Sequence, residues 1–172
     1  MSELSSDEAF TEFVAAHGAR LVRSAELMCG DRGRAEDLVQ TALEKTYVRW
    51  RKIDHAEDAY AYVYRAVLNG HRDWWRQLRG RETSTDTPPE RAFNDRTSHL
   101  VSRDSVLRAL ATLTNRERSV VVLRYYDGQS EREIADILRI APGTVKSTAA
   151  RALGKLRQHP GLVENVLTEE KA

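Results

Sequence analysis

Apolar residues recur every three or four positions along most of the chain, which is the spacing of helices that bury one side. The pattern predicts helices over about Asp7–Leu27, Ala35–Trp50 and Glu57–Arg79. In the third helix the predicted buried stripe is Ala59, Tyr62, Val63, Ala66, Val67 and Trp74, with Tyr60 and Tyr64 on other faces. No segment alternates apolar and polar residues long enough to predict a strand. The pattern therefore favours an all-α fold.

Further along, the pattern predicts short helices on either side of a tight break. Thr114 with Glu117, and Ser130 with Glu133, have the spacing of capping boxes, which begin helices. Pro142 then suits the first position of a final helix. This is the spacing of a helix-turn-helix, whose second helix enters the major groove of DNA. The side chains predicted to be exposed for that contact are Thr144, Lys146, Ser147, Thr148, Ala150 and Arg151.

Between these two parts the helical pattern stops. Residues 82–99 are rich in Ser, Thr, Asp and Pro, and Pro88-Pro89 excludes a helix there. We therefore predict two small helical domains, residues 1–81 and 104–172, joined by a flexible linker over residues 82–103.

The net charge of +1 hides two basic windows. Residues 65–81 contain five arginines and one acid, and residues 139–157 contain five cations and no acid. Such windows suit an anionic partner, although a solvated helix face has the same composition. In the first window, aromatic and arginine side chains alternate as in proteins that bind single-stranded nucleic acid. Core packing is the alternative for these rings, but adjacent Trp74 and Trp75 point about 100° apart and cannot both join one buried stripe.

The longest aliphatic run, Val120–Leu123, is far shorter than a membrane span, and the N-terminus is acidic where a signal peptide would be basic. We expect a cytoplasmic protein without a membrane segment. Cys29 is the single cysteine, so it cannot form an intrachain disulfide, and we expect a buried, inert thiol.

Four segments of the chain, taken in order, resemble the sigma-70 family of RNA polymerase sigma factors. They are A-E-D-L-V-Q at 35–40, V-L-N-G-H-R-D-W-W-R-Q-L-R at 67–79, L-T-N-R-E-R-S-V-V-V-L-R-Y at 113–125 and E-I-A-D-I-L-R-I-A-P-G-T-V-K-S at 133–147. The short length resembles the extracytoplasmic-function type, and the Trp pair is similar to actinobacterial members. The resemblance covers about residues 8–158. The helix-turn-helix alone is shared with other regulators, but its combination with A-E-D-L-V-Q is specific.

The resemblance implies that different residues bind the polymerase, the minus-ten element and the minus-thirty-five element. The first domain would bind the β′ clamp coiled coil of core RNA polymerase through Asp37, Gln40 and Glu44. It would also melt the minus-ten promoter element and bind the single strand through Asn69, Arg72, Trp75, Arg76, Arg79 and, in the preceding loop, His55. The second domain would bind the β flap and read the duplex minus-thirty-five element through Thr144, Lys146, Ser147, Ala150 and Arg151. The linker would run toward the polymerase active centre, and an anti-sigma factor would be a further partner.

The final domain departs from the family pattern at three positions. Arg139 stands where Gly is usual, which implies either a left-handed residue or a different turn. Ala141 replaces the usual hydroxyl cap, at a cost of about 0.5–2 kcal/mol. The small Ala150 leaves recognition there to a thymine methyl or to DNA shape.

The sequence contains no motif that indicates an enzyme. It contains neither G-x-x-x-x-G-K-[ST] nor H-E-x-x-H, and its five histidines are scattered without metal-ligand spacing. We expect no catalytic residue, cofactor or metal. Two other classes remain as alternatives: a helix-turn-helix regulator that acts on duplex DNA without polymerase, and an interaction module with no DNA role.

Overall fold

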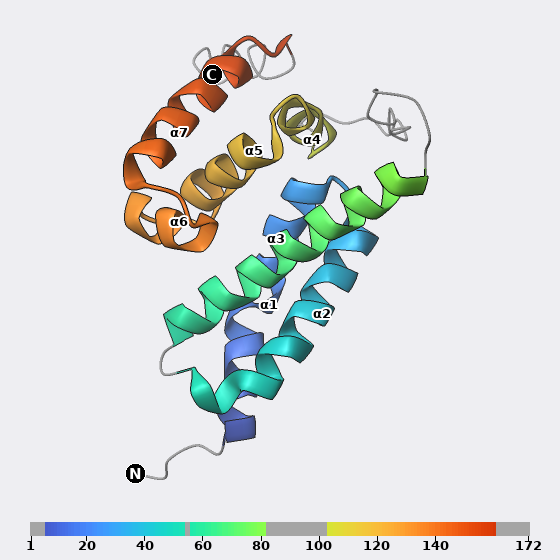
Figure 1. Cartoon of the computed structure of the whole chain (residues 1–172), viewed down its shortest axis with the longest axis vertical. Coiled ribbons are helices and arrows are strands. Elements are labelled where there is room, and N and C mark those ends of the chain that lie inside the picture. Colours follow the sequence, from blue (N-terminus) through green and yellow to red (C-terminus); the bar gives the residue numbers. More distant parts are fainter. Residues whose placement is uncertain (1–5, 54–55, 82–102, 161–172) are drawn as a thin grey trace, which may run out of the picture.

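The structure, a computed structural model, describes residues 6–53, 56–81 and 103–160, and within these ranges it contains helices and no strand (Figure 1). The predicted all-α class is confirmed. The elements are α1 Ser6–Cys29, α2 Arg32–Arg49, the 3-10 turn η1 Trp50–Lys52, α3 Ala56–Arg81, α4 Arg103–Ala111, α5 Asn115–Val121, the π-helical turn η2 Val122–Tyr126, α6 Glu131–Leu138 and α7 Pro142–Arg157. We call α1–α3 the N-terminal half and α4–α7 the C-terminal half. The predicted linker, apart from Arg103, lies outside the described residues, so the proposed domain limits stay a prediction.

The N-terminal half is a bundle in which α2 packs against both α1 and α3. Leu21, Val39 and Val63, one from each helix, are buried at its centre. Asp31 begins α2, because its carboxylate accepts a hydrogen bond from the Arg34 backbone N at 2.7 Å. Cys29 is buried, as predicted, and it ends α1 two residues beyond the predicted helix end. Its Sγ donates to the Asp31 carbonyl.

Both predicted capping boxes are present in the C-terminal half. The Thr114 N donates to Glu117 Oε2 at 2.9 Å, and the Glu117 N donates to Thr114 Oγ1 at 3.3 Å. The same reciprocal pair joins Ser130 and Glu133 at 2.7 and 3.2 Å. These bonds satisfy backbone donors at the helix starts and thereby set the directions of α5 and α6.

The predicted buried stripe of α3 is only partly correct. Ala59, Val63 and Val67 are buried, but Tyr62, Ala66 and Trp74 are half-buried. Tyr60 and Tyr64, placed on other faces by the sequence pattern, are buried. The reason is that α3 packs on two sides: against α1 and α2, and against α6 of the C-terminal half. A helix covered on two sides buries more than one stripe.

The second covering surface exists because the two halves are in contact (Figure 1). Their buried apolar residues form one continuous cluster. Polar contacts cross the boundary as well: the Arg118 Nη1 donates to the Met28 carbonyl at 2.7 Å, and Arg103 pairs with Glu26. The predicted arrangement of two domains on a flexible linker did not include these contacts, because they join residues far apart in the sequence.

Asp127 lies at the centre of this contact, directly after η2. Its carboxylate is fully buried and accepts hydrogen bonds from Ser24 Oγ at 2.8 Å and from Arg20 Nε at 3.1 Å. Burial raises the pKa of Asp127, and the hydrogen bonds from Ser24 and Arg20 act in the opposite direction. The Tyr60 hydroxyl is buried nearby, and no described residue forms a hydrogen bond of good geometry with it. Burial is the main cause of the raised pKa of Tyr60.

No helix in the described ranges has the length and apolar character needed to span a membrane.

Candidate nucleic-acid interface

The turn of the helix-turn-helix is left-handed at Arg139, with φ 55° and ψ 50°. The sequence left a left-handed residue or a different turn open, and the structure selects the first. The Arg139 backbone N–H donates to the Ala135 carbonyl and ends α6. Ala141 caps α7 without a side-chain hydrogen bond, and Pro142 occupies the start of the helix, both as predicted.

The exposed face of α7 carries most of the predicted minus-thirty-five residues. Lys146, Ser147, Ala150 and Arg151 are exposed, and Thr144 is half-buried at the helix start. Thr148, which the sequence pattern placed among the exposed residues, is fully buried. It shares the inward stripe of α7 with Val145, Ala149 and Ala152, at the three-and-four spacing of one helix side. The exposed cations and hydroxyls retain a surface suited to phosphates and base edges.

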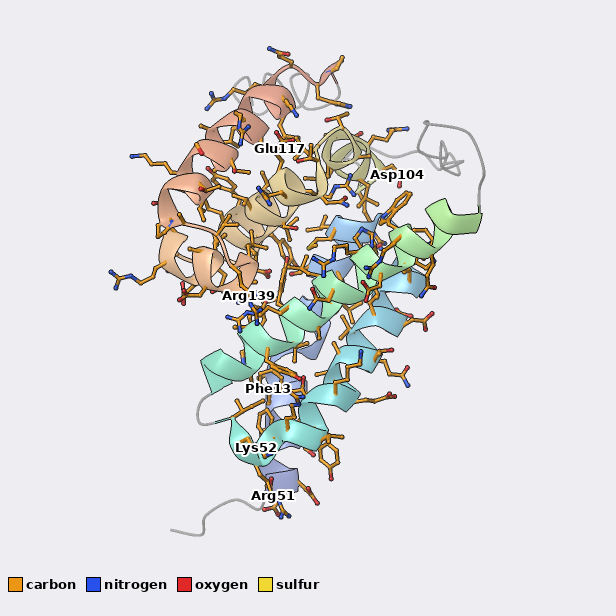
Figure 2. All side chains as sticks on the ribbon, in the orientation of Figure 1. Phe13, Arg51, Lys52, Asp104, Glu117 and Arg139 are labelled. Atoms are coloured by element: carbon orange, nitrogen blue, oxygen red, sulfur yellow. The ribbon has the colours of Figure 1, made fainter. Side chains whose placement is uncertain are left out.

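An ion pair between an exposed lysine and a buried carboxylate joins α7 to α5. The Lys155 Nζ donates to Glu117 Oε2 at 2.9 Å, and Glu117 lies at the capped start of α5 beside α7 (Figure 2). This hydrogen bond is the main cause of the lowered pKa of Glu117, and the bonds from Thr114 add to it. While Glu117 is ionised, this ion pair adds to the apolar packing that holds α7 against α5.

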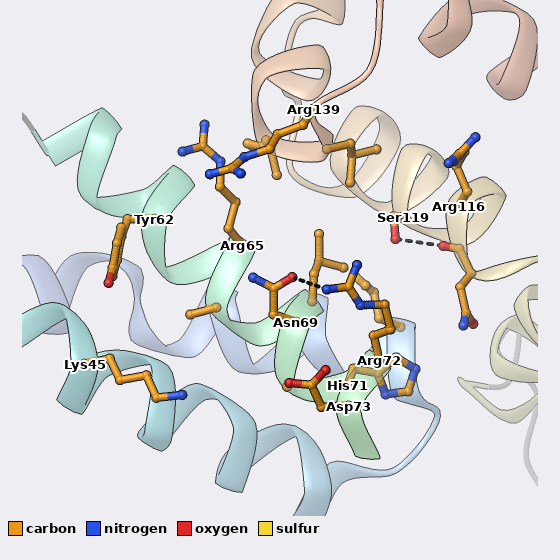
Figure 3. Close-up of a pocket in the computed structure, with 17 residues that line it drawn as sticks. Lys45, Tyr62, Arg65, Asn69, His71, Arg72, Asp73, Arg116, Ser119 and Arg139 are labelled. Carbon is orange, nitrogen blue, oxygen red and sulfur yellow. Dashed lines mark hydrogen bonds between the residues drawn. The ribbon is translucent and has the colours of Figure 1, made fainter. Parts of the chain in front are cut away.

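The predicted minus-ten residues Asn69 and Arg72 lie together on the exposed side of α3 (Figure 3). The Arg72 Nη2 donates to Asn69 Oδ1 at 3.3 Å. The Asn69 amide nitrogen keeps its donors for another group, such as a base edge. Both residues line a pocket of about 690 Å³ that the C-terminal half closes on its other side.

Trp75 contacts two neighbouring rings of α3. Its Nε1 donates to Nε2 of the buried His71 at 3.1 Å, and its ring meets Trp74 edge-on with ring centres 5.0 Å apart. The Arg34 guanidinium lies 3.1 Å from the centre of the Trp74 ring. Trp75 is half-buried in this cluster. Arg76 is exposed and paired with Asp73. His55 and the side chain of Arg79 lie outside the described residues.

The predicted polymerase contacts Asp37, Gln40 and Glu44 are all exposed on α2. The Gln40 Nε2 donates to Glu44 Oε1 at 3.3 Å. Gln40 and Glu44 edge an apolar groove between α1 and α2, which also contains Phe10, Val14, Val22, Leu43 and Tyr47.

The sequence interpretation missed Val48, which is 84% exposed. Val48 follows Asp37 and Glu44 at eleven and four positions, so helical spacing places all three on one face. An aliphatic residue on an otherwise polar face was the available signal. With the adjoining groove it makes this side of α2 suited to bind another helix.

Among the described residues, no cluster of three or more His, Cys, Asp or Glu is placed to hold a metal ion.

Comparison with known proteins gives matches in both halves. Residues 13–81 match the family model for Sigma-70 region 2, and residues 103–156 match the model for Sigma-70, region 4. The chain is 40% identical over 149 residues to the RNA polymerase sigma-E factor of Streptomyces coelicolor, covering 87% of this chain and 84% of that protein. It is 36% identical over 146 residues to the ECF RNA polymerase sigma factor SigL of Mycobacterium tuberculosis, covering 82% of each.

Solved structures with low sequence identity share the fold. The sigma factor RpoE of Bartonella quintana, solved with the anti-sigma factor NepR, matches with a TM-score of 0.70 and 22% identity, covering 87% of this chain and 95% of that one. CnrH, solved with the cytosolic domain of CnrY, matches with a TM-score of 0.62 and 23% identity, covering 87% and 86%.

Proposed function

The chain belongs to the extracytoplasmic-function group of the sigma-70 family of RNA polymerase sigma factors, and on that premise we propose which of its surfaces carry each step of promoter recognition. The observation that supports the assignment is that three sets of predicted residues occupy separate faces: α2, the exposed side of α3, and α7. A protein that must hold a polymerase, a single strand and a duplex at once needs three such faces. It acts in the cytoplasm as a non-catalytic subunit.

The α2 face binds core RNA polymerase. Asp37, Gln40 and Glu44 supply polar contacts to the β′ clamp coiled coil, while Val48 and the groove beside Leu43 supply apolar area. The C-terminal half binds the β flap.

The α3 side binds the melted minus-ten strand. Asn69 reads a base edge with its amide, and Arg72 and Arg76 hold phosphates. The Trp74–Trp75 cluster, fixed by His71 and Arg34, offers a preformed stacking surface at the end of the melted segment. His55 and Arg79 complete this set.

The α7 face reads the minus-thirty-five duplex. Lys146, Ser147 and Arg151 contact base edges and phosphates, Thr144 binds the backbone near the helix start, and Ala150 allows a thymine methyl to approach. An anti-sigma factor is the proposed inhibitor, because the RpoE structure that shares this fold was solved with the anti-sigma factor NepR bound.

A reconstitution separates these roles. Arg151→Ala should reduce promoter-directed run-off transcription about fivefold or more, since a base contact contributes about 1–3 kcal/mol, and leave affinity for core polymerase unchanged. Arg157→Ala, an exposed cation near the far end of the same helix, is the matched control. Asp37→Ala with Gln40→Ala should weaken core binding instead. The proposal fails if both sets lose the same activity, or if the chain alone binds promoter duplex tightly and does not support transcription.

A further inference from the structure

The pocket of about 690 Å³ between the halves has cationic walls on both sides (Figure 3). Lys45, Arg65 and Arg72 line it from the N-terminal half, and Arg116 and Arg139 line it from the C-terminal half. Among the described lining residues the one acid is Asp73, and its carboxylate is already paired with Arg76. The contact between the halves therefore brings positive charges together without an equal number of negative ones.

Arg65 and Arg139 are like charges that face each other across the pocket. Their guanidinium groups extend toward the same space from opposite walls (Figure 3). The Arg65 Nη2 donates to the Asp136 carbonyl at 2.9 Å, while its Nε is buried without a hydrogen-bond partner among the described residues. Like charges facing each other disfavour the contact unless an anion lies between them.

The backbone at Arg139 is left-handed, which is unusual for an arginine. A left-handed residue at this turn favours Gly, which adopts positive φ at no steric cost. Arg139 instead places a cation at the boundary between the halves, facing α3 (Figure 2). Its side chain is exposed and packs in no core, so packing does not explain it.

Of this set, only Arg72 is also assigned to a promoter contact. Arg65, Arg116 and Arg139 belong to none of the surfaces assigned above, and the inference stands without those assignments. Arginine forks match phosphate oxygens with two parallel hydrogen bonds, and cations on two walls suit a ligand with more than one phosphoryl group. The pocket volume is within the range of small-molecule sites.

We propose that this pocket binds a small phosphate-bearing anion with at least two phosphoryl groups, which bridges Arg65 and Arg72 to Arg139 and Arg116. Because the walls come from different halves, such an anion binds only while the halves are in contact. By linkage it stabilises that contact.

Calorimetric titration of the full chain with inorganic pyrophosphate, at constant ionic strength and with sulfate as the reference anion, tests the site. We expect saturable binding that weakens at least tenfold in Arg139→Gln and in Arg116→Gln and persists within a few fold in Arg139→Lys. Arg132→Gln, the same charge change at an exposed position of α6 outside the pocket, should bind like the unaltered chain.

Two further measurements complete the test. Small-angle scattering should give a smaller radius of gyration with pyrophosphate, by an amount that Arg139→Gln abolishes. Titration with a single-stranded oligothymidylate distinguishes the phosphates of a nucleic acid from those of a small molecule. The proposal is overturned if Arg139→Gln binds pyrophosphate as tightly as the unaltered chain, if Arg132→Gln loses as much, or if the oligonucleotide alone binds. None of these measurements uses polymerase or a promoter, so failure here is separate from failure of the proposed function.

Discussion

Ser24 and Asp127 join the two halves through a buried hydrogen bond. The Ser24 Oγ lies 2.8 and 2.9 Å from the two carboxylate oxygens of Asp127, although the residues are 103 positions apart. Both side chains are fully buried. Arg20 reaches the same carboxylate with its Nε and the Asp127 carbonyl with Nη2. A polar group buried in this way depends on its partner, so the contact between the halves is specific in position as well as apolar.

Removing either partner should destabilise the protein. We expect Ser24→Ala and Asp127→Ala each to lower the free energy of unfolding by about 1–3 kcal/mol, because each leaves a buried polar group without its hydrogen bond. The double variant should lose less than the sum, with a coupling of about 0.5–3 kcal/mol. Urea denaturation measures all three. Ser147→Ala, at an exposed position, should change stability by less than about 0.5 kcal/mol. Strict additivity of the two substitutions would show that the bond contributes nothing.

The same carboxyl should give a distinctive pH dependence. Burial raises the pKa of Asp127 above its ordinary 3.8, so the folded protein holds this proton more tightly than the unfolded chain does. The contribution of Asp127 to stability is therefore highest at acid pH and declines as pH rises from 3.8 through the raised pKa. Asp127→Asn removes this titration. The difference in unfolding free energy between Asp127→Asn and the unaltered chain should change across that window and be flat above it; a difference that is constant with pH contradicts the assignment.

Local signals in the sequence predicted the helix starts correctly, because a capping box is complete within four residues. Thr114 with Glu117 and Ser130 with Glu133 needed no knowledge of the rest of the fold. The Asp31 cap of α2 is equally local and was available to the same reasoning. The left-handed Arg139 could be predicted as one of two outcomes, because it stands at a turn position where the family pattern has Gly.

Contacts between distant residues could not be predicted in this way. Tyr60 and Tyr64 are buried where α3 meets α1: the Tyr60 ring contacts His17, and the Tyr64 hydroxyl donates to Met28 Sδ at 3.0 Å. No pattern within α3 alone predicts which neighbour covers these rings. The pairing of Ser24 with Asp127 is likewise a property of the assembled halves. Thr148 was misplaced for a simpler reason: its hydroxyl suggested exposure, but helical spacing from Val145 and Ala152 puts it on the buried side. Most of the predicted site residues in the described ranges are exposed on α2, α3 and α7, with Trp75 and Thr144 half-buried, and their roles stay a proposal.

The ion pair between Glu117 and Lys155 should stabilise the C-terminal half at neutral pH. The hydrogen bond from Lys155 lowers the pKa of Glu117, so its contribution is present above the ordinary value of 4.5 and is lost as pH falls through the lowered pKa. We expect Lys155→Ala to cost about 0.5–1.5 kcal/mol at neutral pH, and less as the acid is protonated. Thermal unfolding at several pH values measures this. Lys146→Ala, an exposed lysine on the same helix, should cost less than about 0.5 kcal/mol at every pH. An equal cost for both lysines would exclude a specific pair.

Two substitutions of Arg139 should distinguish the effect of its left-handed backbone on stability from the effect of its side chain. A non-glycine residue in the left-handed region costs about 1–2 kcal/mol, so Arg139→Gly should raise the free energy of unfolding by about 1 kcal/mol despite the greater freedom of Gly in the unfolded chain. Arg139→Ala keeps the steric cost and should bring no such gain. Arg132→Gly, within α6, should instead lower stability by about 1 kcal/mol, because Gly is a poor residue for a helix interior. Chemical denaturation of the three variants measures these effects. If Arg139→Gly and Arg139→Ala lose the same stability, the guanidinium group rather than the left-handed turn determines which residue this position tolerates.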